Sequence, residues 1–174
     1  MVEAAIMKSK IAFAGAALAV ALFAGSSASA DPRETSPNDP TCRIGGKPAL
    51  MVHVTGLKNG AGKVRVQAYG PGAAKHLAKG GWAGRVDYPL GGRREANICL
   101  PLPRAGAYSV AVRHDSNANR KSDMNDGAGF SRNPKLSLLG RPSFGETAVR
   151  VGNGPTRVNV VMNYRKGIGV GPIS

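Results

Sequence analysis

The sequence has few of the residues on which enzymes and metal sites commonly rely. It contains two cysteines, three histidines and 5% aromatic residues. It has no Gly-x-Ser-x-Gly nucleophile elbow and no zinc-ligand spacing. His114 and Asp115 are adjacent and would point to opposite faces of a strand, so they do not form a ready-made catalytic pair. We therefore expect a non-enzymatic protein without catalytic residues, and a hydrolase using His114 is the least favoured alternative.

Long apolar runs are also missing after the N-terminus, so no later segment is expected to span a membrane. At the N-terminus, two lysines precede an apolar stretch at residues 11–25 and a small-residue cleavage motif at residues 28–30. We expect residues 1–30 to be a signal peptide that is removed after export, with Met7 as the true start. The mature chain is then expected in the bacterial periplasm or outside the cell.

Acidic residues are scarce, with 10 Asp and Glu against 24 Lys and Arg, for a formal net charge of +14. Outside a cell, the polyanions available to such a chain include lipopolysaccharide and acidic glycans. The simpler alternative is a well-solvated basic surface. The basic residues are scattered and no ladder of aromatic residues interleaves them, so nucleic-acid binding is not expected.

The two cysteines, Cys42 and Cys99, are predicted to form a structural disulfide, because an exported chain is oxidised. The bond would close a long loop and contribute roughly 4 kcal/mol to stability. A redox or metal role would need closer spacing or more thiols.

Period-2 alternation of apolar residues dominates the chain and predicts strands. Residues 31–48 are expected to form a flexible lead-in, residues 49–164 one β-sandwich domain, and residues 165–174 a flexible tail. About seven short strands with frequent turns favour an all-β antiparallel sandwich.

Within that domain we predict two hairpins. The first joins residues 50–55 to the strand that starts at Val64, across the Asn59-Gly60 turn. The second joins residues 147–151 to residues 156–164. Further strands are expected at residues 95–100 and 107–114, whereas residues 70–92 are expected to form an irregular crossover with one short turn of helix.

The segment after residues 107–114 carries oxygen-bearing side chains at every second position. Their spacing matches the ligand positions of an EF-hand-type calcium loop. The candidate Ca²⁺ ligands are Asp115, Asn117, Asn119, Lys121 (through its backbone carbonyl), Asp123 and Asp126. Arg120 stands where the sharp turn of such a loop favours glycine, and the alternative is a turn organised by its own Asp and Asn side chains. Any Ca²⁺ affinity is expected to be weak, on the order of 10⁻⁴ to 10⁻³ M.

Trp82 and Tyr88 form the other candidate ligand surface, since exposed aromatic rings can stack on sugars. The alternative is that Trp82 fills the end of a small core, because large aromatic side chains are usually well buried.

Three blocks of the sequence resemble one exported bacterial family, called domain of unknown function 2141. The blocks are Leu57-x-Asn59-x-x-Gly62-x-Val64, then Leu102-Pro-x-x-Gly106-x-Tyr108-x-Val110-x-Val112-x-His114-Asp115-x-Asn117-x-Asn119-x-x-x-Asp123, and Gly129-Phe130-Ser131-x-Asn133 followed by Pro142-x-Phe144. The resemblance covers about residues 49–164. It implies a secreted sandwich similar to transthyretin-like and other immunoglobulin-like modules, and it implies no particular activity. Family members commonly have glycine where this chain has Arg120.

We therefore expect an exported, non-enzymatic binding module of the bacterial envelope. Its partner would be an anionic glycan, lipopolysaccharide or another envelope protein. The alternative from a different functional class is a purely structural or assembly domain with an inert loop.

Overall fold

The structure is a computed structural model that describes residues 38–44 and 46–173. The expected signal peptide, and residues 31–37 and 45 of the expected lead-in, lie outside the described residues. Ten strands and two short helices are described: α1 (Thr41–Ile44), β1 (Ala49–Thr55), β2 (Lys63–Tyr69), β3 (Trp82–Pro89), β4 (Ala96–Pro101), β5 (Gly106–Asp115), β6 (Gly127–Phe130), α2 (Phe144–Thr147), β7 (Ala148–Val151), β8 (Pro155–Val161), β9 (Asn163–Lys166) and β10 (Gly169–Pro172). None of the described helices is long and apolar enough to cross a membrane.

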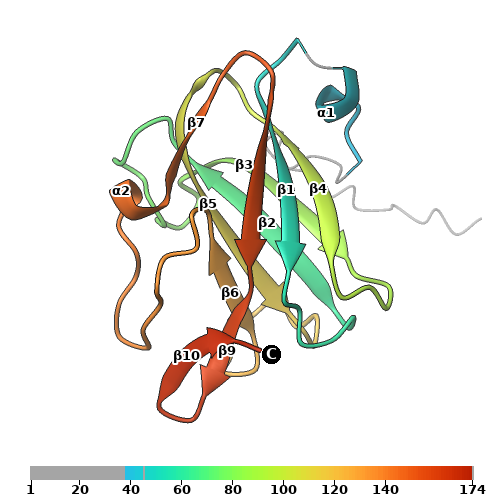
Figure 1. Cartoon of the computed structure of the whole chain (residues 1–174), viewed down its shortest axis with the longest axis vertical. Coiled ribbons are helices and arrows are strands. Elements are labelled where there is room, and N and C mark those ends of the chain that lie inside the picture. Colours follow the sequence, from blue (N-terminus) through green and yellow to red (C-terminus); the bar gives the residue numbers. More distant parts are fainter. Residues whose placement is uncertain (1–37, 45, 174) are drawn as a thin grey trace, which may run out of the picture.

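The strands form two sheets that pack face to face, which confirms the all-β sandwich (Figure 1). The smaller sheet has the order β4-β1-β8. The larger has the order β10-β9-β6-β5-β2-β3, and β7 also pairs with β5. All described pairs are antiparallel except β1 and β8, which run parallel with Val52 opposite Val158. β5 is the centre of the larger sheet, because it pairs along its length with β2 on one side and with β7 and then β6 on the other.

Alternation along the strands fills the core between the two sheets. On β2, Val64 and Val66 are fully buried while Arg65 faces outward, and β5 alternates in the same way. Val52 and Val54 of β1 supply the opposite wall of the core. The outward face of the larger sheet therefore carries the polar residues of β2, β3 and β5, and it is this face that bears the candidate site.

Both predicted hairpins are wrong, although the strands themselves are present. β1 and β2 lie in different sheets, and residues 56–62 carry the chain from one sheet to the other. β7 pairs with β5, whereas β8 pairs with β1, so the second expected hairpin is also a crossover. Alternation identifies the face of a strand that meets the core, but two strands can share that core either side by side or across it.

Two regions that were expected to lack strands contain them. Residues 82–89 form β3, and the strand pattern is broken there by Gly84, whose missing side chain leaves room for the Leu100 side chain of β4. Residues 165–172 of the expected tail are part of the β9–β10 hairpin, which begins at residue 163 and has Gly169 opposite Lys166.

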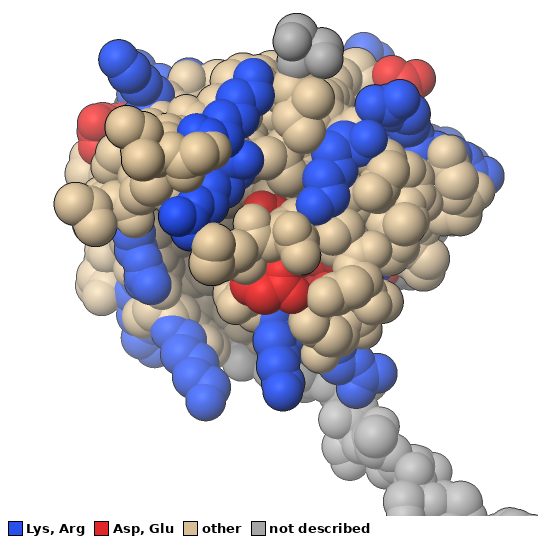
Figure 2. Space-filling view, turned by 90° about the horizontal axis from the view of Figure 1, so that it is seen from below, with Lys and Arg blue, Asp and Glu red and all other residues tan. Residues whose placement is uncertain are grey.

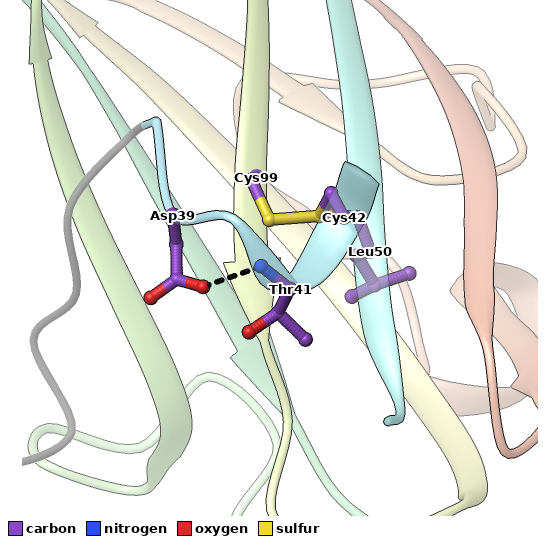
Figure 3. The surroundings of a disulfide bond; sticks show 5 residues. All are labelled: Asp39, Thr41, Cys42, Leu50 and Cys99. Atoms are coloured by element: carbon purple, nitrogen blue, oxygen red, sulfur yellow. Dashed lines mark hydrogen bonds between the residues drawn. A yellow bond between two sulfur atoms is a disulfide. The ribbon is translucent and has the colours of Figure 1, made fainter. Parts of the chain in front are cut away.

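The predicted disulfide between Cys42 and Cys99 is confirmed, with the two Cα atoms 5.8 Å apart (Figure 3). It ties α1 to β4 at the edge of the smaller sheet. The Asp39 carboxylate accepts a hydrogen bond of 2.9 Å from the Thr41 amide and holds the chain just before α1 (Figure 3).

Candidate functional site

The Asp/Asn-rich loop connects β5 to β6 beside the β9–β10 hairpin. Its first residue, Asp115, is fully buried at the end of β5. The Oδ2 atom of Asp115 accepts a hydrogen bond of 2.9 Å from the Arg120 amide and lies 3.5 Å from the Arg113 guanidinium. Its Oδ1 atom is buried and has no hydrogen-bond partner. One carboxylate oxygen therefore shapes the loop, while the other is left without a donor.

The exposed part of the loop is organised by side-chain amides. The NH₂ groups of Asn117 and Asn119 donate to Oδ2 of Asp123 at 2.9 and 3.0 Å. Their carbonyl oxygens accept the backbone N–H groups of Asn119 and Lys121 at 3.2 and 2.8 Å. Hydrogen bonds, above all from the Asn125 amide, lower the pKa of Asp123. This arrangement is a turn organised by its own Asp and Asn side chains, which was the alternative to a calcium loop.

Asp126 is the last residue of the loop, and its pKa is shifted in the direction opposite to that of Asp123. Its Oδ2 atom accepts the Asp123 amide at 3.3 Å, whereas its Oδ1 atom is buried without a partner. Burial raises the pKa of Asp126, and the negative charges of Asp123 and Asp115 raise it further. A proton or a cation near these carboxylates would relieve that repulsion.

The predicted calcium ligands therefore fall into two groups. Asn117, Asn119 and Asp123 form an exposed cluster, whereas Asp115 and Asp126 each have one buried oxygen without a hydrogen-bond partner. Lys121 is exposed. Among residues 38–44 and 46–173, no three His, Cys, Asp or Glu side chains are gathered closely enough to hold a metal ion by themselves. The coordination shell of a cation bound here would have to be completed by amide oxygens, backbone oxygens or water.

His114 is buried at the end of β5 and connects this strand to β9 and to the segment between β1 and β2. Its Nδ1 atom is 2.6 Å from the Tyr164 hydroxyl and its Nε2 atom is 2.9 Å from the Ala61 carbonyl. The hydroxyl also accepts the Lys58 amide, so it donates to Nδ1, and Nε2–H donates to Ala61. This pattern needs a neutral ring, and burial lowers the pKa of His114 accordingly. The side chain is 0% exposed and has no free ring nitrogen for a substrate.

The other family-like motif residues also have structural roles. The buried Ser131 hydroxyl accepts the Val110 amide at 2.9 Å and donates to the Thr147 carbonyl. Asn133 accepts the Val161 amide at 2.8 Å and donates to the Asn159 carbonyl, which ties the segment after β6 to β8. Asn133 therefore joins the two sheets, whereas Ser131 joins β5 to α2.

Trp82 and Tyr88 do not form an exposed aromatic surface. Trp82 is 6% exposed at the start of β3, and Tyr88 is half-buried against the core. Trp82 is therefore buried, but it does not belong to the main apolar core, and the Arg85 guanidinium lies over its ring, 5.6 Å from the ring centre.

The structure instead contains a groove on the outward face of the larger sheet. The groove has a volume of about 560 Å³ and lies between the Asp/Asn-rich loop, β10 and the loop at residues 136–142. Ala111 and Phe130 contribute to its floor, and Arg113, Arg141 and Arg165 line it. Arg113 is partly buried, and its Nε atom is buried without a hydrogen-bond partner.

Sequence reasoning missed this groove because its walls come from loops far apart in the chain. The alternation of residues 107–114 does indicate that Arg113 faces outward from its strand. Nothing local shows that Arg141 and Arg165 face the same space.

A second charged cluster continues the same sheet face. The Asp87 carboxylate of β3 receives two hydrogen bonds from Arg65, at 2.7 and 2.8 Å, and lies near Lys63 and Arg85. Burial alone would raise the pKa of Asp87, but Arg65 and the two other cations outweigh it and hold the pKa well below its usual range. Seen from below, the molecule has a small acidic patch surrounded by many Lys and Arg side chains (Figure 2).

Two packed sheets with an arginine-lined groove on one outer face define an all-β sandwich protein with a candidate ligand site on that face. The chain belongs to the bacterial family whose description is "uncharacterized protein conserved in bacteria" (DUF2141), and the family model matches residues 52–159. Comparison with curated proteins and with solved structures finds no match. The immunoglobulin-like or transthyretin-like subtype therefore stays a prediction.

Proposed function

We propose that this protein is an exported, non-enzymatic binding module of the bacterial envelope, and that the groove on the larger sheet holds an acidic ligand such as a carboxylated glycan. The observation that carries the proposal is the gathering of Arg113, Arg141 and Arg165 around one groove of about 560 Å³. That volume lies within the range of small-ligand sites. The disulfide is in keeping with an oxidising compartment.

The charges of the groove favour a carboxylate, sulfate or phosphate group. A guanidinium presents a planar set of donors that matches such anions, often with two parallel hydrogen bonds. The unpartnered Nε of Arg113 leaves one such donor unused at the groove wall. Asp123 and Asp126 also line the groove, and they would repel a ligand charged along its whole length. We therefore expect a ligand with a few spaced acidic groups, in preference to a dense polyanion.

The test is titration of the exported protein with a short oligogalacturonate and with its methyl ester, which lacks the charge. Binding of the acid form alone is expected, and Arg141→Gln with Arg165→Gln should weaken it at least tenfold, since hydrogen bonds to charged groups contribute about 1.5–3 kcal/mol each. Arg150→Gln with Arg157→Gln is the matched control, because both arginines are exposed outside the groove. Equal affinity of both double variants for the acid, or equal binding of the ester, would contradict an arginine-lined acidic-ligand site.

A second proposal is that Ca²⁺ binds weakly between Asp115 and Asp126. The support is that each carboxylate has one buried oxygen without a donor, and that the negative charge of Asp115 raises the pKa of Asp126. Calcium takes oxygen ligands of this kind and completes its shell with backbone oxygens and water. The exposed amide cluster around Asp123 is a less suitable centre, because its amides present N–H groups to the carboxylate.

Thermal unfolding with millimolar Ca²⁺ and with a chelator tests this site, because a ligand of the native state raises the unfolding midpoint by mass action. Asp126→Asn should remove the shift, whereas Asn117→Ser in the exposed cluster should keep it. Absence of a shift in the wild type at 10 mM Ca²⁺ would rule out the site.

A further inference from the structure

The large exposed hydrophobic residues of the described chain are confined to three segments around the groove. All of the large apolar side chains that are exposed in residues 38–44 and 46–173 lie there, and they are Met124, Leu138, Leu139, Ile168 and Ile173. Leu139 and Ile168 are 101% and 98% exposed, so neither makes a contact that the fold requires. Single exposed apolar residues are common on proteins, but here no large one occurs elsewhere on the described surface.

Three of these residues occupy loop tips. Met124 lies in the loop between β5 and β6, Leu139 in the loop after β6, and Ile168 at the turn between β9 and β10. The segments are neighbours in space, because the Met124 sulfur lies 3.3 Å from the Arg165 guanidinium and because Met124, Leu138 and Val170 line the same groove.

Each apolar tip is flanked by exposed basic residues. Lys121 precedes Met124, Lys135 and Arg141 flank Leu139, and Arg165 with Lys166 precedes Ile168. Figure 2 shows Lys and Arg side chains projecting around the lower end of the molecule, where β9 and β10 lie in Figure 1. Asp123 and Asp126 are the acidic residues of the same segments, and Asp123 is already engaged by two side-chain amides.

We infer that this end of the molecule docks onto a lipid surface with anionic headgroups, with the tips at Met124, Leu139 and Ile168 entering the boundary between headgroups and acyl chains. Separate apolar tips carried by polar, basic loops suit a bilayer interface, where each tip finds an apolar layer at the same depth. The basic side chains stay at headgroup level. A protein partner would need a separate pocket for each tip.

The inference goes beyond the proposed function and does not rest on it, because Leu139 and Ile168 do not line the groove. Met124, Leu138 and Val170, from the same segments as the tips, line the groove, so docking would bring the groove close to the membrane surface. A ligand carried on an envelope lipid would then lie within reach.

Cosedimentation of the exported protein with vesicles tests the inference. One set contains phosphatidylcholine alone and the other contains about 30% phosphatidylglycerol, at low and at physiological salt. We expect binding to the anionic vesicles, weakened by salt, and little binding to the neutral ones. Leu139→Ser with Ile168→Ser should lower the partition coefficient at least tenfold, whereas Leu139→Met with Ile168→Met should retain it.

Because these side chains are exposed, both double variants should unfold at the wild-type temperature, and that measurement separates lost docking from lost folding. Equal binding of the Ser and Met variants, binding to neither vesicle, or equal binding to both would overturn the inference. Full competition by soluble glycerophosphate at millimolar concentration would also overturn it, since it would show capture of a free headgroup in the groove. Arg141→Gln with Arg165→Gln reports on the groove separately through the oligogalacturonate titration.

Discussion

The backbone at Arg120 has φ 65°, in the left-handed region that side chains with a Cβ atom avoid. This conformation lets the Arg120 amide reach the buried Asp115 carboxylate. We expect Arg120→Gly to raise the free energy of unfolding by about 0.5–1 kcal/mol, because relief of strain exceeds the extra freedom of glycine in the unfolded chain. Urea unfolding measures this change. Lys121→Gly, at a neighbouring position without positive φ, is the control and should be neutral or destabilising.

The neutral state that the fold requires of His114 predicts a pH dependence of stability. Its pKa in the folded protein is lowered by burial, so in the unfolded chain the ring binds a proton more readily, with a pKa near 6.5. The free energy of unfolding should therefore fall as the pH drops below about 6.5 towards the lower pKa of the folded state.

His114→Gln can keep both hydrogen bonds without titrating, and it should show a smaller loss between pH 7.5 and pH 5 in urea unfolding. The half-exposed His53, replaced by glutamine in the same way, is the matched control. If His114→Gln loses as much free energy of unfolding between pH 7.5 and pH 5 as the wild type and His53→Gln do, the assignment of this pH dependence to His114 is wrong.

Among the elements, β6 shows most directly how two sheets constrain a short strand. It contains Gly127 and Gly129, and a Cβ atom on Gly129 would lie 2.6 Å from a methyl carbon of Val160 in the opposite sheet. We expect Gly129→Ala to destabilise the protein by about 1–3 kcal/mol, the usual range for overpacking. Gly145→Ala is the control, because nothing lies within 4 Å of its added Cβ atom. Thermal unfolding of both variants tests the prediction, and equal midpoints would contradict it.

The elements also show what sequence patterns can resolve. Strong alternation at residues 64–69 and 107–114 predicted β2 and β5, whereas Gly84 hid β3 and the glycines of residues 167–171 hid β10 and its pairing with β9. Strand pairing was mispredicted because it depends on which strands meet across the core, and no local pattern records that. The Asp/Asn-rich loop was visible because its residues are consecutive. The groove was not, because Arg113, Arg141 and Arg165 meet only in the folded chain.

At the scale of the whole molecule, the large exposed apolar side chains of the described residues lie in the loops around the groove, while the disulfide lies at the edge of the smaller sheet, away from the groove. This separation assigns different roles to different regions. The motif residues and the disulfide support the sandwich, and the loops around the groove are free to serve binding. Stability and binding should therefore respond to different substitutions, as they do at independent sites.

The disulfide gives the sharpest test of that division. Its cysteines are separated by 57 residues, and closure of a loop of that length restricts the unfolded chain by an amount worth roughly 4 kcal/mol. We expect Cys42→Ala with Cys99→Ala to lower the free energy of unfolding by about 2–4 kcal/mol. The dependence on denaturant should steepen, because the uncrosslinked unfolded chain exposes more surface. Urea unfolding of this variant should match that of the reduced wild type, and the oligogalacturonate affinity of the folded variant should be unchanged. A wild-type midpoint in the double variant would contradict the stabilising role, and a loss of affinity without loss of folding would contradict the separation of scaffold from site.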